Sequence, residues 1–476
     1  MNYYFLGIGG IGMSALARYL KQQGHTVSGY DRTASPLTHQ LEAEGIAIHY
    51  DDNPTLIRPQ PDLVVYTPAV PADTAEMVYL RQSGVEMVKR AELLGRITAG
   101  SRCIAVAGSH GKTTTTSLIA HLLHQAGVSC TAFLGGICKN FGSNLLVDPD
   151  SRFTVVEADE YDRSFLHLHP HIAVVTATDA DHLDIYGTRQ AMLEAYLQFA
   201  NQTDADGMLV VKEGCFVKDD GEPLVEFGHH HDEHEEHDHN HHHHDHNNFN
   251  TPVSTYTTHG IEADYYAINV RHYNGNIFFD LRTPQGVFYD LQLTNSCLYN
   301  VENAVAASAV ALRCGLNEYQ LRAGLKSFQG IARRFDYRIK ESGLVYIDDY
   351  AHHPREIAAT LESIRYLFPG KRTVGIFQPH LYSRTAQFAD EFAEVLSQLD
   401  EIILMPIYPA RERPIPGVSA HTILKKIDSM SKYLCSPQQV LELVPALCPE
   451  VVVTLGAGNI DRLVPDLEQT LRENLL

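Results

Sequence analysis

The sequence predicts an α/β protein of three domains, in which strands alternate with helices along the whole chain. Its 476 residues are too many for one hydrophobic core, and a prior of about 150 residues per domain suggests three domains. Short apolar runs typical of buried strands alternate with longer segments whose apolar residues recur at helical spacing. This alternation is typical of parallel sheets covered by helices.

The composition narrows the class of protein. Hydrophobic residues make up 44% of the chain and charged residues 20%, which is ordinary for a soluble globular protein. No apolar run approaches the roughly 20 residues of a membrane span, and the chain opens in a strand pattern rather than a signal peptide. The net charge of −21 argues against a nucleic-acid partner, because phosphate backbones are bound by basic surfaces. We therefore expect a cytoplasmic protein with no membrane or nucleic-acid partner.

The cysteines and one histidine-rich run bear on disulfide bonding, metal binding and disorder. The 8 cysteines are scattered without a CxxC pair, which favours reduced, mostly buried thiols over disulfides or a zinc site. The run "HHHDEHEEHDHNHHHHDH", residues 229–246, holds no apolar residue to bury, so we expect a disordered loop over 228–250. This loop is either an inert surface insertion or a weak binder of zinc, nickel or copper.

The first domain is expected over residues 1–99. The run "YYFLGIG" predicts a strand leading into glycines, "MSALARYLKQQGH" predicts a helix, and a second strand closes on Asp31. The run "GIGGIG" fits G-x-G-x-x-G between a strand and a helix, as in a Rossmann-like domain, where backbone N–H groups meet a pyrophosphate. A nicotinamide or flavin dinucleotide and the diphosphate of a UDP-sugar both satisfy this pattern. Glycines used only for tight packing are a third interpretation.

The second domain is expected over 100–331 as a central P-loop-type ATPase domain. The strand "RCIAVAG" leads into "GSHGKTTTT", which has the Gly-Lys-Thr of a phosphate loop but carries Val106 where the first glycine is usual. In this loop Lys112 would face the β and γ phosphates of a nucleotide, and the hydroxyl of Thr113 would face Mg²⁺. The parallel sheet gains extra antiparallel strands from turns at Asn274-Gly275 and Gln285-Gly286.

Two acidic segments of this domain each follow a predicted strand. They are "VVEADEYD" and "DADHLD", and they place Glu157 and His182 at the carboxyl ends of strands, where ligands gather in open parallel sheets. Together with Thr113 these residues suit Mg²⁺ or Mn²⁺. Taken singly, an acid after a strand is as often a helix cap, and a lone histidine is more often structural.

The third domain is expected over 332–476 as a C-terminal Rossmann-like α/β domain. The run "GLVYIDDYAHHP" predicts a strand followed by a helix that starts at a proline, with Ile357, Leu361 and Ile364 on one face. The strands "RTVGIF", "EIILMPI" and "VVVTLGAG" then alternate with helices to the end of the chain.

Eight ordered motifs spread over the three domains closely resemble the Mur ligase family. They are "GSHGKTTT", "EADEYDRSF", "DADHLD", "YNVENA", "ARRFD", "DDYAHHP", "QPHLYSRT" and "GAGNI". The resemblance is strongest to the members that add L-alanine to UDP-N-acetylmuramate. It implies an ATP-dependent ligase of peptidoglycan precursor synthesis, hence a role in cell wall biogenesis, cell shape and cell division. The substrates would be UDP-N-acetylmuramate, L-alanine and ATP, with Mg²⁺ or Mn²⁺, in a monomer or homodimer.

The resemblance also implies a set of site residues. Contacts with the UDP-sugar fall on Gly9, Gly10, Ile11, Gly12, Met13, Ser14, Asp31, Thr67, Lys139, Asn140 and Asn144. Contacts with ATP fall on Gly108, Ser109, His110, Gly111, Lys112, Thr113, Thr114, Asn300, Arg333 and Asp349. The amino acid would meet His353, His380 and Arg384, the metal would meet Thr113, Glu157 and His182, and the catalytic residues would be Lys112, His182, His353 and Arg384.

The implied reaction passes through an acyl phosphate, and other functions stay open. The sugar's lactoyl carboxylate attacks the γ phosphate of ATP, the alanine amine displaces phosphate, and a histidine of "DDYAHH" is a candidate base. Leu381 stands where alanine-adding members often carry a second arginine, which leaves Arg384 to bind the amino-acid carboxylate. The alternatives are a ligase that attaches a ready-made peptide to the same sugar in murein recycling, an NAD-dependent dehydrogenase and a P-loop switch protein.

Overall fold

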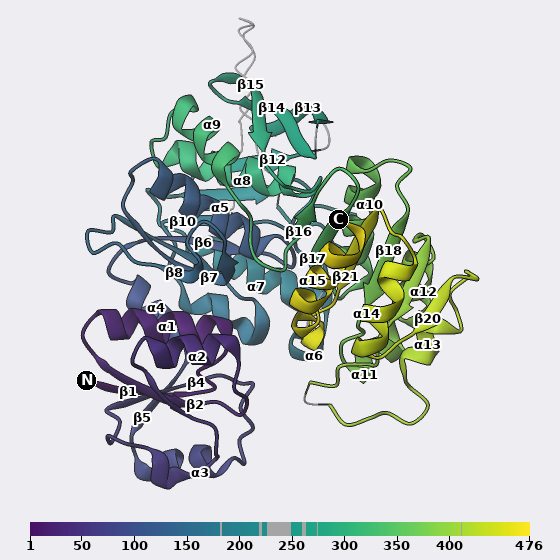
Figure 1. Cartoon of the computed structure of the whole chain (residues 1–476). Helices are drawn as coiled ribbons and strands as arrows, with labels where there is room; N and C mark the ends of the chain where they lie inside the picture. The colour runs from purple at the N-terminus through teal and green to yellow at the C-terminus, as the bar shows by residue number, and fades with distance from the viewer. Residues whose placement is uncertain (181–182, 219–220, 226–248, 259–262, 274, 411) are drawn as a thin grey trace, which may run out of the picture. The chain divides into compact units, whose positions relative to one another are not determined.

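The computed structural model describes residues 1–180, 183–218, 221–225, 249–258, 263–273, 275–410 and 412–476 (Figure 1). These residues divide into two compact units. Unit 1 holds residues 1–269, 279–291 and 302–328, and unit 2 holds 270–278, 292–301 and 329–476. The expected histidine-rich loop lies outside the described residues from 226 to 248.

The first sheet of unit 1 has five parallel strands in the order β3-β2-β1-β4-β5. Its strands are β1 (Asn2–Leu6), β2 (Thr26–Tyr30), β3 (Ala47–His49), β4 (Leu63–Tyr66) and β5 (Glu86–Lys89). The helices of this part are α1 (Ile11–Gln22), α2 (Pro36–Ala43), the 3₁₀ turn η1 (Pro54–Leu56), α3 (Ala75–Ser83) and α4 (Arg90–Thr98). The chain continues on the other side of β1 after β3, so the glycine loop behind β1 lies where ligands bind in such sheets.

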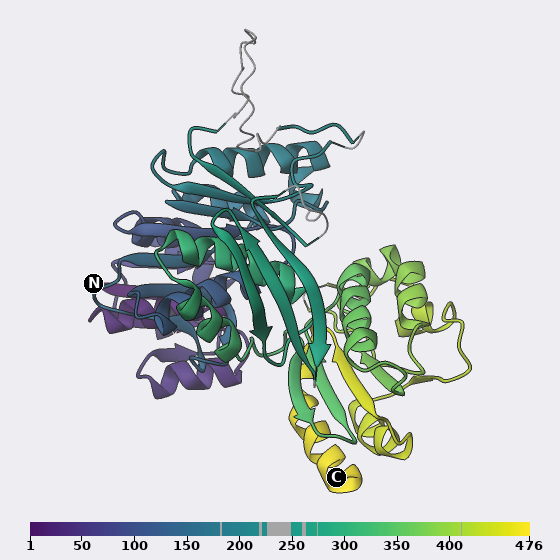
Figure 2. The same ribbon diagram turned by 90° about the horizontal axis from the view of Figure 1, so that it is seen from above.

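The second sheet has the order β15-β14-β13-β12-β11-β10-β6-β9-β7-β8, with β6 between β10 and β9. Its strands are β6 (Arg102–Ala107), β7 (Cys130–Cys138), β8 (Ser143–Leu146), β9 (Phe153–Glu157), β10 (Ile172–Val175), β11 (Met208–Lys212), β12 (Val253–Thr257), β13 (Tyr265–Tyr273), β14 (Asn276–Thr283) and β15 (Gly286–Leu293). Figure 2 shows the last three as long neighbouring strands in teal and green. The helices are α5 (Lys112–Gln125), the 3₁₀ turn η2 (Tyr161–His167), α6 (Leu183–Tyr186), α7 (Arg189–Asn201), α8 (Asn300–Arg313) and α9 (Glu318–Ser327).

Helix α1 packs against both sheets of unit 1, because it contacts β2 on one side and β7 and β8 on the other. At this contact the guanidinium of Arg18 donates to Asn144 Oδ1 at 2.6 Å. Asn144 in turn donates to Ser14 Oγ at 2.9 Å and to the carbonyl of Ile11 at 2.6 Å. A buried polar network of this kind fixes one orientation of the helix on the strands, since each group would lose its hydrogen bonds if the contact slipped.

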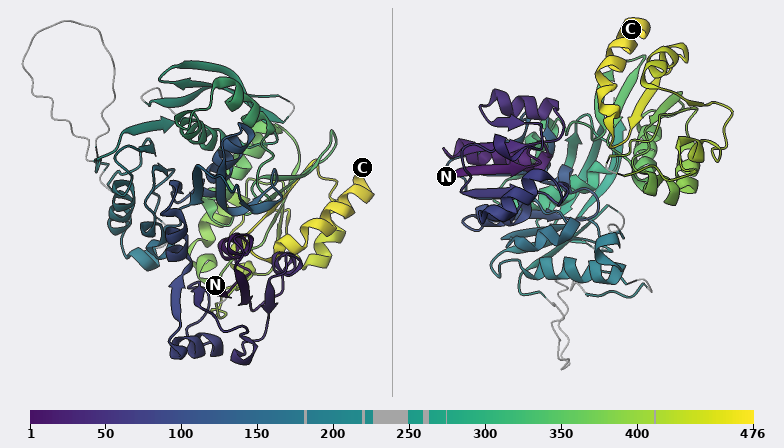
Figure 3. Two further views of the ribbon diagram at one scale, coloured as in Figure 1. Left: turned by 90° about the vertical axis from the view of Figure 1, so that its left-hand side faces the viewer. Right: turned by 90° about the horizontal axis from the view of Figure 1, so that it is seen from below.

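The sheet of unit 2 has the order β16-β17-β21-β18-β19-β20. Its strands are β16 (Asp336–Lys340), β17 (Val345–Asp349), β18 (Thr373–Phe377), β19 (Glu401–Leu404), β20 (Lys432–Leu434) and β21 (Val451–Leu455). The helices are α10 (Pro354–Leu367), α11 (Tyr382–Gln387), α12 (Ala389–Leu396), α13 (Ala420–Leu424), α14 (Pro437–Ala446), the 3₁₀ turn η3 (Asn459–Arg462) and α15 (Val464–Leu475). Helices α14 and α15 contact each other and cover the same part of the core (Figure 3).

The predicted fold class is confirmed. The sheets are mostly parallel, and antiparallel pairs occur where β8 joins β7 and where β16 joins β17. Each predicted domain range carries one sheet of its own, while the exact boundaries at 99 and 331 stay predictions. All the cysteines are free, and all but Cys448 are buried. In the described part of the chain no helix has the length and apolarity needed to cross a membrane.

Candidate functional site

The phosphate-type loop follows the carboxyl end of β6, in the middle of the second sheet. Gly108, Ser109, His110 and Gly111 form the loop, and Lys112 is the first residue of α5. Thr113 and Thr114 are buried in the first turn of that helix. Val106 is fully buried in β6, in register with Glu157 of β9. A glycine is not needed at position 106, because the chain leaves the strand only after Ala107.

The loop turns tightly against Thr176, and this explains the glycine at its start. Gly108 has a φ of +139°, and a Cβ atom there would lie 2.1 Å from Thr176 Oγ1. The same hydroxyl donates to the carbonyl oxygens of Ala107 and His110 at 3.1 Å and 2.5 Å. Both the backbone angle and the space therefore require glycine.

Lys112 lies in a buried ion pair with Glu160. Its Nζ is 2.9 Å from Glu160 Oε1 and 2.8 Å from Oε2, and it also donates to the Gly108 carbonyl at 2.6 Å. Burial acts to lower the pKa of Lys112, but the carboxylates of Glu160, Glu157 and Asp159 outweigh it and the pKa is raised. The ammonium group is therefore held in its charged form beside the loop, as phosphate binding requires.

The acidic segment that supplies Glu160 has two further ion pairs. Asp159 Oδ2 is 3.0 Å from Arg90 Nη2, and Asp162 Oδ2 is 2.5 Å from Lys89 Nζ. The two basic residues lie at the junction of β5 and α4 in the first domain. The segment thus connects that domain with the phosphate loop. Sequence reasoning selected Glu157 from this segment and missed the ion pair of Glu160, although the density of charge in "EADEYD" was a signal.

Glu157, the predicted metal ligand, has one buried carboxylate oxygen without a hydrogen bond. Its Oε2 is buried and accepts no hydrogen bond from the described residues. The carboxylate lies so close to β7 that a Cβ atom on Gly135 would be 2.0 Å from Oε2, so a larger residue there would displace the carboxylate. An uncompensated buried carboxylate oxygen is costly unless a cation or donor reaches it, so Glu157 fits the predicted metal site. His182, the other predicted ligand beside Thr113, lies outside the described residues.

The predicted UDP-sugar residues fall into two groups in unit 1. In the first, the Gly9 N–H donates to Asp31 Oδ2 at 2.8 Å, and Gly10, Ile11, Gly12 and Met13 continue from this loop into α1. Thr67 follows β4 and lies beside Gly7, where a Cβ atom would be 2.9 Å from its methyl group. These residues therefore gather at the carboxyl end of the first sheet.

The second group lies around β7 and β8. Lys139 and Asn140 follow β7, and Asn140 donates to the Ser327 carbonyl at 2.9 Å. Asn144 and Ser14 are fully buried in the network with Arg18. A direct contact between either of these two side chains and a ligand would need that network to open.

In unit 2, Asp349 ends β17 and is buried. Its Oδ2 accepts from Thr360 Oγ1 at 2.7 Å and from the Tyr299 hydroxyl at 3.3 Å. Burial raises the pKa of the Asp349 carboxyl to about 6, although the Thr360 hydrogen bond and the charge of Arg334 act in the opposite direction. Asn300, another predicted ATP contact, is the first residue of α8 and belongs to the same unit as Asp349.

Arg333 stands three residues before the start of β16, with a φ of +64°. Its guanidinium donates to the Gly456 carbonyl at 2.6 Å and lies 3.5 Å from Asp348 Oδ2 and 3.6 Å from Asp461 Oδ2. Burial raises the pKa of Asp348 to about 6, and Arg333 opposes this shift. A strained backbone with several partners holds the arginine in one place. Asp348 was missed by sequence reasoning, which took only the second acid of "DDY".

The three predicted amino-acid contacts also lie in unit 2. His353 is the N-cap of α10, and its Nδ1 accepts the Arg355 N–H at 3.3 Å. The His380 ring stacks on Tyr408 with centroids 5.8 Å apart and is 6.1 Å from the His352 ring. The half-buried side chain of Arg384 forms no hydrogen bond or ion pair with another described residue. Burial lowers the pKa of His352. The charge of Glu356 acts to raise this pKa, and the charge of Arg384 acts to lower it further.

Three family models match the chain, in the same order as its three predicted domains. Residues 2–102 match the family model described as "Mur ligase family, catalytic domain", 106–311 match "Mur ligase middle domain", and 333–458 match "Mur ligase, glutamate ligase domain". The chain belongs to the Mur ligase family. The resemblance found in the motifs is thus confirmed, and the sheets of this Mur ligase correspond to the three matched regions.

Individual relatives align with this Mur ligase over almost its whole length. It is 48% identical over 474 residues to the UDP-N-acetylmuramate–L-alanine ligase of Parabacteroides distasonis, with 98% of this chain and 96% of the relative covered. It is 43% identical over 485 residues to the ligase of the same name from Flavobacterium johnsoniae, with 100% and 98% covered.

Solved structures agree on the fold. A UDP-N-acetylmuramate-alanine ligase from Thermotoga maritima superposes with a TM-score of 0.81 at 24% identity and 99% coverage of both chains. A murein peptide ligase from Psychrobacter arcticus superposes with a TM-score of 0.68 at 22% identity, covering 99% of this chain and 98% of that one.

The raised pKa of Asp349 predicts a pH-dependent stability effect for Asp349→Asn. Below the ordinary pKa of 3.8 the carboxyl is protonated in both the folded and unfolded states. Between 3.8 and about 6 only the unfolded state loses the proton, so stability falls as the pH rises, and above that range the loss is complete. At 1.36 kcal/mol per pKa unit this loss is about 3 kcal/mol, and asparagine removes it.

Urea unfolding at pH 4 and pH 8 measures this effect. We expect the unfolding free energy of Asp349→Asn minus that of the parent to be about 1–3 kcal/mol larger at pH 8 than at pH 4, so that the variant gains stability relative to the parent. The exposed Asp428→Asn is the control and is expected to shift equally at both pH values. A pH-independent effect of Asp349→Asn would contradict the assignment.

Proposed function

We propose that this Mur ligase joins L-alanine to the carboxylate of UDP-N-acetylmuramate in peptidoglycan precursor synthesis, with ATP as the energy source. The observation that carries the proposal is the near-complete match to relatives of that name at 40–48% identity. The phosphate loop and its charged lysine support this proposal, because the reaction needs a nucleoside triphosphate that is bound through its phosphate groups.

The proposed ligation has two steps. A lactoyl carboxylate oxygen forms a bond to the γ phosphorus while the bond to the β–γ bridging oxygen breaks, which gives an acyl phosphate and ADP. The amine nitrogen of alanine then attacks the acyl carbon, phosphate leaves and the amine loses a proton. Catalysis of phosphoryl transfer is mainly positioning and charge stabilisation.

In unit 1 the phosphate loop binds ATP. The N–H groups of Gly108, Ser109, His110 and Gly111, with the first turn of α5, surround the phosphates, and Lys112 neutralises negative charge on the transferring group. Thr113 and Glu157 are the described residues that would hold Mg²⁺ or Mn²⁺, with His182 as a third ligand. The ion supplies positive charge at the phosphate oxygens.

In unit 2 Asn300, Arg333 and Asp349 are proposed to contact the rest of ATP, and His353, His380 and Arg384 to bind L-alanine. Arg384 suits the alanine carboxylate, since its guanidinium has two parallel donors and no partner among the described residues. Leu381, at φ +70°, is the N-cap of α11, the helix that carries Arg384, and the Thr385 hydroxyl donates to the Leu381 carbonyl at 2.8 Å. A base for the amine is proposed among His352 and His353.

The first sheet of unit 1 is proposed to bind the UDP moiety at the loop from Gly9 to Met13 with Asp31 and Thr67, while Lys139 and Asn140 approach the sugar. We place the reaction in the cytoplasm and propose small-molecule partners only. The oligomeric state, monomer or homodimer, stays a prediction. A peptide-adding ligase and an NAD-dependent dehydrogenase are not favoured, because the near-full-length relatives carry the alanine ligase name.

The first test measures ADP formation with UDP-N-acetylmuramate, with and without L-alanine. We expect turnover only with both substrates, and Lys112→Met is expected to lower kcat by about 10²–10³-fold because charge stabilisation of the phosphoryl group is lost. The exposed Lys425→Ala is the control. Unchanged turnover in Lys112→Met, or turnover with a free tripeptide but not with alanine, would refute the proposal.

The second test concerns the metal. Glu157→Gln keeps the size of the side chain but removes the negative charge, so we expect the Mg²⁺ concentration for half-maximal ADP formation to rise at least about tenfold. A Mn²⁺ titration is run in parallel, and the exposed Glu194→Gln on α7 serves as control. The assignment fails if Glu157→Gln and the parent show the same metal dependence.

The third test concerns alanine recognition. Arg384→Lys keeps the charge but loses the paired donors, so the KM for L-alanine is expected to rise about tenfold or more, with a smaller change in kcat. Initial rates over a range of L-alanine, L-serine and glycine concentrations measure this, and the exposed Arg462→Lys is the matched control. An unaltered KM for L-alanine would exclude Arg384 from the carboxylate contact.

A further inference from the structure

A hollow in unit 1 lies at the edge of the central sheet opposite the phosphate loop. It opens at the amino ends of β6, β9 and β10 and has a volume of about 210 Å³. Its polar lining consists of Arg102, Arg152, Arg313, His171, Asp206 and Cys314. We call it the arginine pocket. None of these residues belongs to the proposed ligase site.

The three arginines come from three different places in the chain and share this one hollow. Arg102 begins β6, Arg152 precedes β9, and Arg313 ends α8. Neither Arg102 nor Arg152 forms an ion pair with a carboxylate among the described residues, although the chain has 58 acidic and only 37 basic residues. The Arg152 guanidinium lies 5.1 Å from the centre of the Phe153 ring, and Arg313 donates to the carbonyls of Asp206 and Gly207 at 3.4 Å.

The charges of the three arginines also affect the pKa of the Cys314 thiol. Burial raises its pKa to about 12, and the charges of Arg152, Arg313 and Arg102 act in the opposite direction. The three arginines and Cys314 line the same hollow. Unpaired charges gathered in one place repel each other, so their arrangement favours an anion between them.

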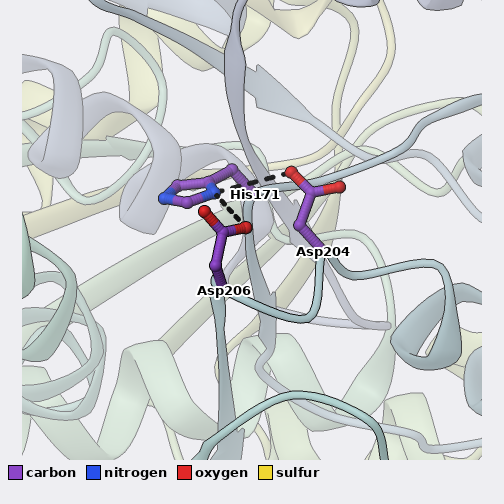
Figure 4. Close-up of side chains that lie close together, drawn as sticks. All are labelled: His171, Asp204 and Asp206. Carbon is purple, nitrogen blue, oxygen red and sulfur yellow. Dashed lines mark ion pairs between the residues drawn. The ribbon is translucent and has the colours of Figure 1, made fainter.

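His171 forms the other side of the pocket, and Figure 4 shows it facing the carboxylates of Asp204 and Asp206. Its Nδ1 is 3.5 Å from Asp204 Oδ2 and 3.8 Å from Asp206 Oδ1. The three side chains have ligand atoms within 4.8 Å of one another, as a divalent cation would need. The two aspartates are, however, largely exposed, and three guanidinium groups surround the adjoining space. A cation there would be repelled, whereas an anion gains from each arginine.

We propose that the arginine pocket binds a small phosphate-bearing anion. Guanidinium groups bind phosphate oxygens through paired donors, and three of them exceed the charge of the one aspartate that lines the pocket. The volume is below the roughly 300–1,000 Å³ of pockets that enclose drug-sized ligands, so it matches a phosphate group rather than a whole nucleotide. The anion is either free phosphate or the phosphate group of a monoester. This site is separate from the phosphate loop.

The test is a calorimetric titration of inorganic phosphate into the full-length protein saturated with ADP and Mg²⁺, so that the phosphate loop is occupied. We expect binding in the parent protein and at least a tenfold higher Kd in Arg102→Gln/Arg152→Gln. The exposed Arg282→Gln on β14 removes a similar charge from unit 1 and is expected to leave the Kd unchanged. Circular dichroism of each variant confirms that it is folded. The same Kd in the double variant and the parent, or no binding at all, overturns the proposal.

Two further arms identify the ligand. A parallel titration uses glycerol phosphate: binding of phosphate alone assigns the pocket to the free ion, and binding of both ligands assigns it to monoesters as well. Either result supports the proposal if it depends on the arginines. A third titration uses Zn²⁺ with the His171→Ala variant. Zinc binding that requires His171, with no phosphate binding, would show a cation site and overturn the proposal.

Discussion

The buried ion pair between Lys112 and Glu160 is the interaction on which the proposed phosphate site depends. Two charges removed from water cost several kcal/mol each, and the cost is offset only if they stay paired and hydrogen-bonded. Here the ammonium group also reaches the Gly108 carbonyl, so one side chain holds both the acidic segment and the start of the loop. Arrival of nucleotide phosphates would place a second set of anions beside the lysine. Glu160 therefore keeps Lys112 charged and oriented before ATP is present.

The same acidic segment connects the loop with the first domain. Asp159 and Asp162 pair with Arg90 and Lys89, which lie where β5 passes into α4. These pairs are partly exposed, and each is worth little by itself. Their importance is geometric, because they tie the helix behind the first sheet to the segment that orients Lys112. The Arg18–Asn144–Ser14 network fixes the other side of this contact, so the two sheets of unit 1 are joined at two places.

Local chemistry explains which parts of the site were predictable from the sequence. Gly108 and Lys112 were predicted because a turn at a helix start imposes its residue types directly. The partner of Lys112 was not, since η2 contains two residues with left-handed backbone, Asp162 and Arg163, which no periodicity reveals. Ser14 was interpreted as a ligand contact, but a short polar residue in the first turn serves equally well in a buried network. The arginine pocket depends on residues far apart in sequence, which only the folded sheet brings together.

The two adjacent acids at the end of β17, Asp348 and Asp349, have different hydrogen-bond and ion-pair partners. Successive residues of a strand point to opposite faces, so Asp348 and Asp349 are buried in different surroundings. Asp348 meets Arg333 and Thr454 and thereby fixes the arginine, while Asp349 meets Thr360 and Tyr299. Burial raises the pKa of both to about 6, so at neutral pH each ionises at the expense of folding stability. A core built for stability alone would place neutral residues there. We therefore propose that ligand binding accounts for both acids, with Asp349 as the direct contact and Asp348 as the residue that positions Arg333.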